Sequence, residues 1–334
     1  MHKKTGMVVG KFMPLHKGHE RLIHFASKLS NLTVLVDSWK SEQVPAPTRA
    51  QWIQTMFPSI QVLPIDTHMP ASEEESASPA EFWATWKNKI YSMIGFPELV
   101  FTSEFYGEKL AKTLNAEWIP CDISRTAIPI SATQIKEDKI RNWKYISQPA
   151  QEYFQKRVVV MGPESTGKTT LCLELAAAMN SQGVETKVIP EYAEEYIKHT
   201  RSVERLNLYD LEFFLSAQVA SLESANRYPS PLVIMDTDYL TTQVWAEHLF
   251  SKQLMNPIPA QPDLTILTSP EVEWFPDSHR VPSEREQSRR WRFFRLCQEH
   301  LKREGRKYMV LDGTSFVARQ NAAYSAILEL IRTI

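Results

Sequence analysis

Two glycine-containing stretches of the chain carry residues that bind phosphate. One of them, GPESTGKTT at residues 162–170, follows the β-branched run RVVVM and precedes a helical pattern. In this strand, loop and helix context, the spacing GxxxxGK[ST] directs backbone N–H groups and a helix N-terminus at phosphate oxygens. Lys168 then reaches the β- and γ-phosphates of a nucleoside triphosphate, and the Thr169 hydroxyl ligates Mg²⁺. The stretch predicts ATP as a co-substrate, contacted by Gly162, Glu164, Ser165, Thr166, Gly167, Thr169 and Thr170.

Carboxylates follow two apolar runs in the same half of the chain. A phosphate loop of this kind needs a metal-ordering carboxylate at the end of a neighbouring strand, and Asp236 follows the run LVIM. We expect Asp238 either to take a hydroxyl proton from the acceptor substrate or to cap the next helix. Glu191 and Tyr192 follow another run, where open α/β sheets bind ligands, unless they are ordinary first-turn residues of a helix.

Several arginines follow Trp274 in a polar stretch that prolines interrupt. On a loop that closes over the site, Arg280 and Arg285 would neutralise charge on a phosphoryl group during transfer. The alternative is a solvated helix face on which the arginines pair with acidic residues one turn away. The sequence alone leaves both interpretations open.

The other phosphate-binding stretch, GKFMPLHKGH at residues 10–19, follows a short apolar run and opens an amphipathic pattern. His16 and His19 flank Gly18, which lets the backbone come close to a ligand. Two imidazoles beside Lys11 at a helix N-terminus form a nest of hydrogen-bond donors for phosphate, with no obligatory metal. The stretch therefore predicts a second phosphate site.

This stretch resembles the GxFxPxHxGH signature of the nucleotidyltransferase superfamily, which Gly10, Phe12 and Gly18 also match. The superfamily carries a later motif, ISxTxxR, which holds a triphosphate at a helix N-terminus, and ISATQIK at residues 130–136 resembles it. The resemblance implies phosphate contacts from Ser131, Thr133 and Lys136. Lys136 stands where the family has arginine, so it keeps the charge and loses the bidentate fork. Taken alone, the segment predicts only a serine-capped helix.

Short apolar runs alternate with amphipathic stretches, which is typical of βαβ units and a parallel sheet. The pattern occurs twice and is interrupted at residues 142–149. We expect an α/β protein with two open, mostly parallel sheets: a Rossmann-like nucleotidyltransferase domain over residues 1–150 and a P-loop kinase domain over residues 151–334. The expected strands are residues 7–10, 32–36, 61–65, 98–101, 118–121, 157–161, 184–189, 232–235, 264–267 and 308–311.

Composition excludes several other classes of protein. The 334 residues correspond to about two domains at roughly 150 residues each. With 38 Lys and Arg residues against 39 Asp and Glu residues, the net charge of −1 lacks the basic excess of a dedicated nucleic-acid binder. No window approaches the ~18 consecutive apolar residues that a membrane span requires. The N-terminal residues also lack the apolar region of a signal peptide, so we expect a cytoplasmic protein.

A nucleotidyltransferase domain followed by a P-loop kinase domain resembles the bacterial NadR family, and the resemblance covers nearly the whole chain. The matching segments include GKFMPLHKGH, ISATQIK, NWKYI, GPESTGKTT, PEYAEEY and MDTDYLTTQ. The family joins nicotinamide mononucleotide (NMN) adenylyltransferase to ribosylnicotinamide kinase. The resemblance implies that ATP phosphorylates nicotinamide riboside to NMN, and that adenylyl transfer from a second ATP to NMN gives NAD and pyrophosphate.

The same resemblance implies which side chains meet the substrates. Trp83 and Trp86 resemble an aromatic pair near nicotinamide, where a pyridinium cation stacks on indole, unless they pack a helix into the core. Arg49 and Arg125 are expected at the NMN or the riboside. Mg²⁺ would span the phosphates, and the transferring phosphoryl group would be stabilised by His16, His19, Lys11 and Lys136.

Many members of the family begin with a DNA-binding helix-turn-helix domain, whereas here the first expected strand begins at residue 7. We expect no DNA binding, and we expect ATP, NMN, nicotinamide riboside and NAD as partners; self-association is left open. An alternative function is a riboside kinase whose first domain senses nucleotide without catalysis, because Lys136 replaces the arginine. A third hypothesis is a nucleotide-sensing scaffold that binds another protein.

Overall fold

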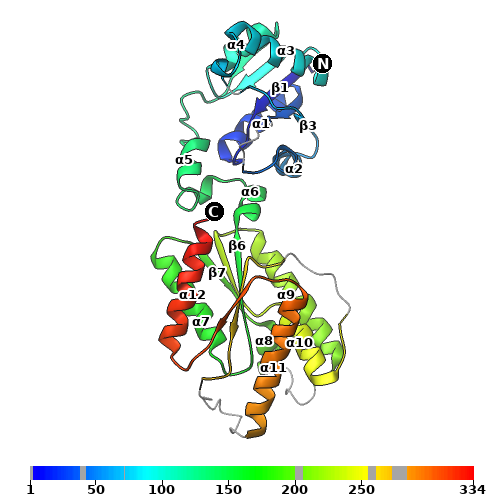
Figure 1. Cartoon of the computed structure of the whole chain (residues 1–334). Helices are drawn as coiled ribbons and strands as arrows, with labels where there is room; N and C mark the ends of the chain where they lie inside the picture. Colours follow the sequence, from blue (N-terminus) through cyan, green and yellow to red (C-terminus); the bar gives the residue numbers. More distant parts are fainter. Residues whose placement is uncertain (1–2, 38–42, 71, 200–205, 255–260, 273–283) are drawn as a thin grey trace. The chain divides into compact units, whose positions relative to one another are not determined.

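The computed structural model describes residues 3–334 except 38–42, 71, 200–205, 255–260 and 273–283, and the side chains of residues 284–286 also lie outside the description. The chain divides into two compact units, Met1–Tyr153 and Phe154–Ile334. Each unit contains a parallel five-stranded sheet with helices on its faces, which confirms the expected α/β class (Figure 1). Within the described ranges, every helix is too short or too polar to cross a membrane.

The sheet of the first unit has the order β3-β2-β1-β4-β5. The strand order reverses between β1 and β4, so the carboxyl end of β1 lies at the switch point where open α/β sheets bind ligands. GKFMPLHKGH begins at this end. The strands are β1 (Thr5–Gly10), β2 (Asn31–Val36), β3 (Gln61–Pro64), β4 (Leu99–Thr102) and β5 (Glu117–Pro120).

Helices cover the central strands of this sheet, which explains their continuous apolar runs. Met7, Val9 and Val100 pack against buried residues of α3 (Pro79–Ile94) and α4 (Tyr106–Thr113). The connections from β1 to β2 and from β2 to β3 contain α1 (Lys17–Leu29) and α2 (Ala46–Met56). The short helix α5 (Ala132–Glu137) follows β5, and α6 (Gln148–Phe154) lies at the boundary between the units.

The sheet of the second unit has the order β10-β9-β6-β8-β7, so β6 lies centrally with β8 as one neighbour. The phosphate loop follows β6 and Asp236 ends β8, which brings the two to the same edge of the sheet. The strands are β6 (Lys156–Met161), β7 (Thr186–Ile189), β8 (Leu232–Asp236), β9 (Leu264–Thr268) and β10 (Tyr308–Leu311).

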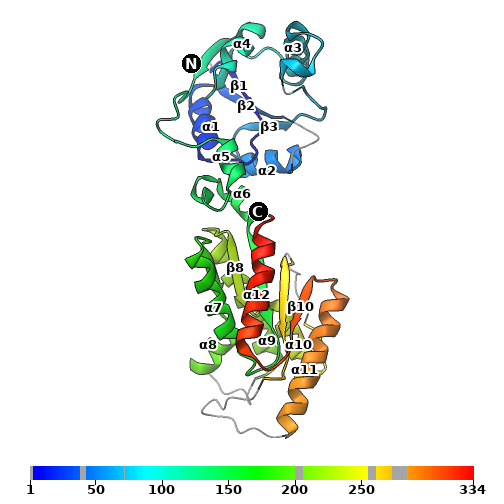
Figure 2. The ribbon, with the colours of Figure 1, turned by 60° about the vertical axis from the view of Figure 1, so that its left-hand side comes forward.

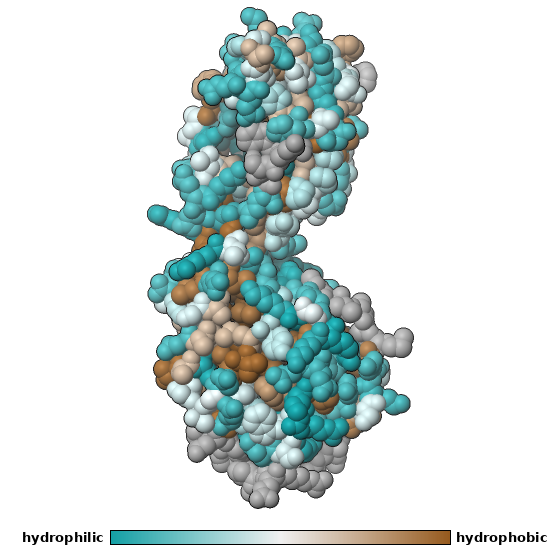
Figure 3. All heavy atoms as spheres, viewed as in Figure 1, coloured by the Kyte–Doolittle hydropathy of each residue, from teal (hydrophilic) through white to brown (hydrophobic). Residues whose placement is uncertain are grey.

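Two groups of helices cover this second sheet (Figure 2). Buried residues of α9 (Leu208–Asn226), α10 (Tyr239–Phe250) and α11 (Glu284–Arg303) pack on one face. Helices α7 (Lys168–Ser181) and α12 (Phe316–Ile331) contact each other and the sheet, and α8 (Tyr192–His199) follows β7. The surface is hydrophilic over α11 and more apolar over α7 and α12, on which Leu173 and Val317 are exposed (Figure 3).

All ten expected strands are present, with ends shifted by two residues at most. The sequence analysis did not predict α4 or α6. The expected aperiodic junction at residues 142–149 forms a short 3-10 helix, Trp143–Tyr145, and the first residues of α6. Trp143 and Ile146 are buried in it, so apolar contacts hold a segment whose sequence pattern gives no periodic signal.

Candidate active sites

His16 begins α1 and uses its imidazole as the N-cap. The ring Nδ1 accepts a hydrogen bond of 3.1 Å from the Gly18 N–H. Because Nδ1 accepts, the proton of the neutral ring lies on Nε2, which is then a donor. Burial, with a smaller contribution from the charge of Arg125, lowers the pKa of His16 to about 4. At neutral pH this side chain is therefore a hydrogen-bond donor without a formal charge.

His19 lies one turn further along α1 and stacks on His16, with ring centroids 3.7 Å apart. The ring of Phe12 contacts the His19 ring edge-on, at a centroid distance of 4.9 Å. Burial and the neighbouring charges of His16 and Arg125 hold the pKa of His19 well below its usual value. Its Nδ1 has no hydrogen-bond partner among the described residues. The helix thus begins with two adjacent neutral imidazoles, one of which has an unused polar atom.

Gly18 is required by the position of the His16 ring. A Cβ at residue 18 would lie 2.9 Å from Cε1 and 3.1 Å from Nδ1 of His16, closer than such contacts normally are. Phe12, which lies earlier in the motif, has a positive φ of 50°, a conformation that is uncommon outside glycine. The GKFMPLHKGH motif therefore encodes both the cap and the space that the cap needs.

Arg49 has a different role from the one that the sequence predicted. Its side chain is fully buried, and its guanidinium donates to the backbone carbonyls of Val44, Lys11 and Asp37. These carbonyls lie on the segments that follow β1 and β2. We therefore correct the assignment: Arg49 holds the two segments at the carboxyl edge of the sheet and is not available to contact a substrate.

Arg125 remains a candidate for binding anions beside the histidines. It has a positive φ of 51° in the loop after β5, donates to Glu104 Oε1 at 3.0 Å, and its charge lowers the pKa of both His16 and His19. Asp122 shapes this loop by accepting hydrogen bonds from the backbone N–H groups of Thr126, Ala127 and Ile128.

An open groove of about 830 Å³ lies beside α1, and its lining includes Lys17 of the motif but none of His16, His19, Lys11 or Arg125. The groove is lined by the exposed side of α1, the end of α2 and the loop after β5, including Lys17, Arg21, His24, Phe57, Cys121, Asp122 and Ile128.

The two tryptophans of α3 both have partners within the protein. Trp86 is only 9% exposed, and its indole N–H donates to Pro70 O at 3.1 Å. Trp83 donates to Glu73 Oε1 at 2.7 Å, and the Lys109 ammonium lies 5.3 Å from its ring centroid, where a pyridinium cation was expected. Trp86 therefore packs α3 into the core, which is the alternative that the sequence left open, and the stacking role of Trp83 stays a prediction.

Ser131 caps α5 through a reciprocal pair of hydrogen bonds. Its hydroxyl accepts from the Gln134 N–H at 3.2 Å, and the Gln134 side chain accepts from the Ser131 N–H at 2.9 Å. Thr133 and Lys136 are exposed, and Lys136 lies in the last turn of the helix, where a cation interacts favourably with the helix dipole. Their expected phosphate contacts stay predictions.

The phosphate loop of the second unit is shaped by contacts that only glycine permits. Gly162 has a φ of 146°, and a Cβ there would lie 2.3 Å from Thr268 Oγ1. Gly167 begins α7 with a φ of 80°. Thr166 Oγ1 lies 2.7 Å from Thr268 Oγ1 and donates to Pro163 O at 2.9 Å. The hydroxyl of Thr166 therefore braces the loop, and the expected phosphate contact of this residue stays a prediction.

Arg290 supports this loop from outside it, a role that sequence reasoning missed. Its buried guanidinium donates to the backbone carbonyls of Glu164 and Ser165 at 3.2 and 3.3 Å. No pattern links a residue of α11 to a loop more than a hundred residues earlier. Arg280 lies outside the described residues, and Arg285 is placed on α11 without a described side chain, so their expected lid role stays a prediction.

Lys168, Thr169 and Asp236 meet at the end of β8. The Thr169 hydroxyl donates to Asp236 Oδ2 at 2.5 Å, and the Lys168 ammonium donates to Pro163 O at 3.0 Å. Burial raises the pKa of Asp236, although Lys168 and Thr169 partly oppose the shift. Asp236 Oδ1 has no hydrogen-bond partner in the described part of the chain. The carboxylate is therefore placed for a ligand that supplies positive charge.

Glu191 follows β7 at the same edge of the sheet. Burial raises its pKa to about 7, opposed by the positive charge of Lys168 and reinforced by the negative charges of Asp236, Glu194 and Glu164. A carboxyl group with a pKa near neutrality is suited to general base catalysis. The next residue, Tyr192, begins α8 and contacts Tyr196 and Phe213.

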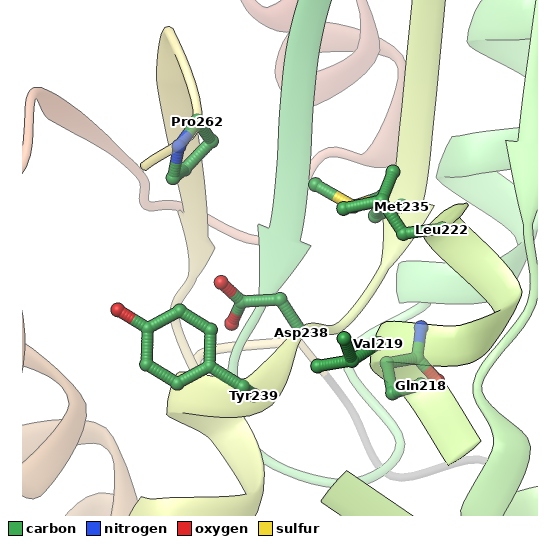
Figure 4. Close-up of a pocket in the computed structure, with 7 residues that line it drawn as sticks. All are labelled: Gln218, Val219, Leu222, Met235, Asp238, Tyr239 and Pro262. Atoms are coloured by element: carbon green, nitrogen blue, oxygen red, sulfur yellow. The ribbon is translucent and has the colours of Figure 1, made fainter. Parts of the chain in front are cut away.

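Asp238 is held in a way that excludes the predicted proton-accepting role. Its Oδ1 accepts from the Leu240 N–H at 3.1 Å and caps α10, and its Oδ2 lies 2.6 Å from Arg306 Nη1 in a buried ion pair. Figure 4 shows it beside Tyr239 at a cavity of only about 20 Å³, room for one water molecule. The capping alternative therefore accounts for Asp238.

These two sites define an α/β protein with a phosphate-loop motif in one unit and a stacked histidine pair at a helix N-terminus in the other. Residues 157–319 match the model of the AAA domain family. The chain is 30% identical to the trifunctional NAD biosynthesis/regulator protein NadR of Escherichia coli, over 83% of this chain and 72% of that protein. The corresponding protein of Salmonella typhimurium is 29% identical over the same shares.

Two solved structures have the same fold. A NadR protein in complex with NR matches with a TM-score of 0.66 and 24% identity, and a NadR protein in complex with NAD and AMP-PNP matches with a TM-score of 0.62 and 23% identity. Each comparison covers 98% of this chain and 96% of the other. The chain belongs to the NadR family.

Proposed function

We propose that this chain makes NAD in two steps, each in its own unit. The unit Phe154–Ile334 phosphorylates nicotinamide riboside with ATP to give NMN, and the unit Met1–Tyr153 transfers the adenylyl group of ATP to NMN. The observation that carries the proposal is the presence, in one chain of the NadR family, of both a phosphate loop with a facing carboxylate and a stacked histidine pair at a helix N-terminus. The names of the relatives, which refer to NAD biosynthesis, agree with it.

In the kinase step a neutral hydroxyl must lose its proton. Glu191, with a pKa of about 7, accepts the 5′-hydroxyl proton of the riboside. The riboside oxygen bonds to the γ-phosphorus, the bond between that phosphorus and the β,γ-bridging oxygen breaks, and ADP leaves. Lys168 and the loop N–H groups offset the negative charge on the phosphates.

The residues at the end of β8 fit Mg²⁺. The site offers an unpartnered buried oxygen, Asp236 Oδ1, and the Thr169 hydroxyl, and Mg²⁺ prefers oxygen ligands. Mg²⁺ is commonly held by one or two carboxylates together with substrate phosphates. When bound, Mg²⁺ would neutralise charge on the phosphates.

In the adenylyl step no general base is needed, because the phosphate of NMN is already an anion at neutral pH. A phosphate oxygen of NMN bonds to the α-phosphorus of ATP, and the bond to pyrophosphate breaks. His16, through its Nε2–H, and His19 donate hydrogen bonds to the phosphates, with Arg125 and Lys11 as nearby cations.

Separate variants test whether the two reactions use separate sites. Lys168→Ala is expected to abolish riboside phosphorylation and to leave adenylyl transfer within a few-fold of the unchanged protein. His19→Ala is expected to do the opposite. Both reactions are followed in each protein by chromatography of NMN and NAD. Parallel loss of both activities in either variant would contradict the proposal.

A further inference from the structure

Gln218 carries a buried amide whose contacts neither the motifs nor the proposed chemistry explain. It lies in the middle of α9 and is only 7% exposed. Burying an amide is unfavourable unless its hydrogen bonds are made, so its partners are informative. The Gln218 side chain accepts from the Tyr192 N–H at 3.1 Å and donates to Pro190 O at 3.4 Å and Thr237 O at 3.5 Å. Because one partner is an N–H donor and the other two are carbonyl acceptors, the positions of the oxygen and the nitrogen of the Gln218 amide are determined.

These partners belong to the loops after two neighbouring strands. Pro190 and Tyr192 flank Glu191, the proposed base, and Thr237 directly follows Asp236, the proposed Mg²⁺ ligand. One side chain from a covering helix thus holds the backbone on both sides of Glu191 and ties it to the end of β8. Figure 4 shows Gln218 on α9, across the small cavity from Asp238 at the start of α10.

The conformation of Thr237 supports a functional reason for this contact. Thr237 is buried and has a φ of 66°, which is an unfavourable backbone conformation for a β-branched residue. Its N–H donates to Val160 O at 2.9 Å and its carbonyl accepts from Gln218. Strained residues that the surroundings hold in place concentrate at functional sites.

We propose that Gln218 is a positioning residue of the kinase site, which sets the separation between Glu191 and Asp236 by joining the loops after β7 and β8. The inference rests on the proposed kinase function of this unit. Without the amide, Pro190 O and the Tyr192 N–H lose their partner, and Glu191 is free to shift relative to the phosphate loop. A displacement of about 1 Å at a reacting group costs roughly 100-fold in rate.

Gln218→Met tests this by removing the amide while keeping the length of the side chain. The matched control is Gln243→Met, because Gln243 also holds a backbone segment of this unit with its amide: it donates to Leu254 O and accepts from the Leu254 N–H, both at 3.0 Å. We expect the kcat of riboside phosphorylation to fall roughly 100-fold in Gln218→Met and less than about threefold in Gln243→Met.

The pH profile separates positioning from a merely structural role. A smaller fraction of folded enzyme would lower kcat equally at every pH. A displaced Glu191 would instead lie in different surroundings, which moves the acidic limb of the pH profile of kcat. Adenylyl transfer in the same protein should stay within a few-fold. If Gln218→Met loses its cooperative melting transition, Gln218→Asn, whose shorter amide cannot span both loops, replaces it in the same assay.

The two proposals fail in different ways. If the unchanged protein and Gln243→Met do not phosphorylate riboside, the proposed kinase function is wrong. If both are active and Gln218→Met or Gln218→Asn either matches them in kcat or loses kcat equally at every pH with the acidic limb unmoved, Gln218 does not position the site and the inference is overturned.

Discussion

The substitution Gly18→Ala should disable adenylyl transfer by moving one ring. A Cβ at residue 18 would lie 2.9 Å from Cε1 and 3.1 Å from Nδ1 of His16, so the ring must move and the cap to the Gly18 N–H is lost. Losing an N-cap costs about 1 kcal/mol, and alanine in place of glycine returns up to about 1 kcal/mol of helix propensity. Stability should therefore change little.

Activity should change much more than stability. His16 donates to the phosphates in this account, and a misplaced donor costs roughly 100-fold in rate, equivalent to about 2.7 kcal/mol on the barrier. The assay is the rate of NAD formation from NMN and ATP in Gly18→Ala, with riboside phosphorylation in the same sample as the internal control. The control reaction should be unaffected.

A double-mutant cycle that combines Gly18→Ala with His16→Asn tests whether Gly18 acts through the His16 ring. Asparagine is a good N-cap and has no imidazole ring to collide with the new Cβ. Adding Gly18→Ala to His16→Asn should therefore cost less than about threefold, which makes the two changes strongly non-additive. The same roughly 100-fold loss in both backgrounds would show that Gly18 acts on the ligand directly and would refute the reasoning.

Three further predictions follow from burial and charge. Glu191 must be deprotonated to act as a base, so kcat/KM for riboside should fall about tenfold per pH unit below pH 7, and Glu191→Gln should remove this limb from a stopped assay over pH 5–9. Arg49→Met should lower the free energy of unfolding of its unit by about 3 kcal/mol in urea titrations, because three buried carbonyls lose their donor; an effect below about 1 kcal/mol would contradict its structural role. The pKa of His16 is depressed in the folded state, so the stability that its neutral ring contributes is complete above pH 6.5 and declines by about 3 kcal/mol as the pH falls to about 4. In His16→Asn the free energy of unfolding should therefore fall less steeply with decreasing pH in the same titrations.

The sequence predicts those parts of the fold that depend on local pattern. The strands appear as apolar runs because helices bury both faces of each sheet. GKFMPLHKGH and GPESTGKTT are predictable because cap, glycine and ligand-binding groups all lie within about ten residues. Asp236 is predictable because it ends an apolar run next to the phosphate loop.

Contacts between distant segments are what the sequence does not reveal. Asp238 follows the same apolar run as Asp236, two residues later, yet its carboxylate forms an ion pair with Arg306, which lies 68 residues further on. In the sequence, Arg49 is indistinguishable from an ordinary polar residue of a helix, and only the folded structure shows that three backbone carbonyls accept hydrogen bonds from it. Arg290 and Gln218 also bind backbone groups that lie far away in the chain. Because nearly every residue type carries the same backbone groups, the sequence does not show which residues are their partners.

The central claim is that one chain carries out both reactions. The most direct measurement is mass spectrometry of the products after the purified protein is incubated with ATP, Mg²⁺ and either nicotinamide riboside or NMN. The account predicts NMN from the riboside and NAD from NMN. Riboside phosphorylation without any NAD would mean that the first unit senses nucleotide and does not catalyse, as the Lys136 replacement allows, and the absence of both products would contradict the account.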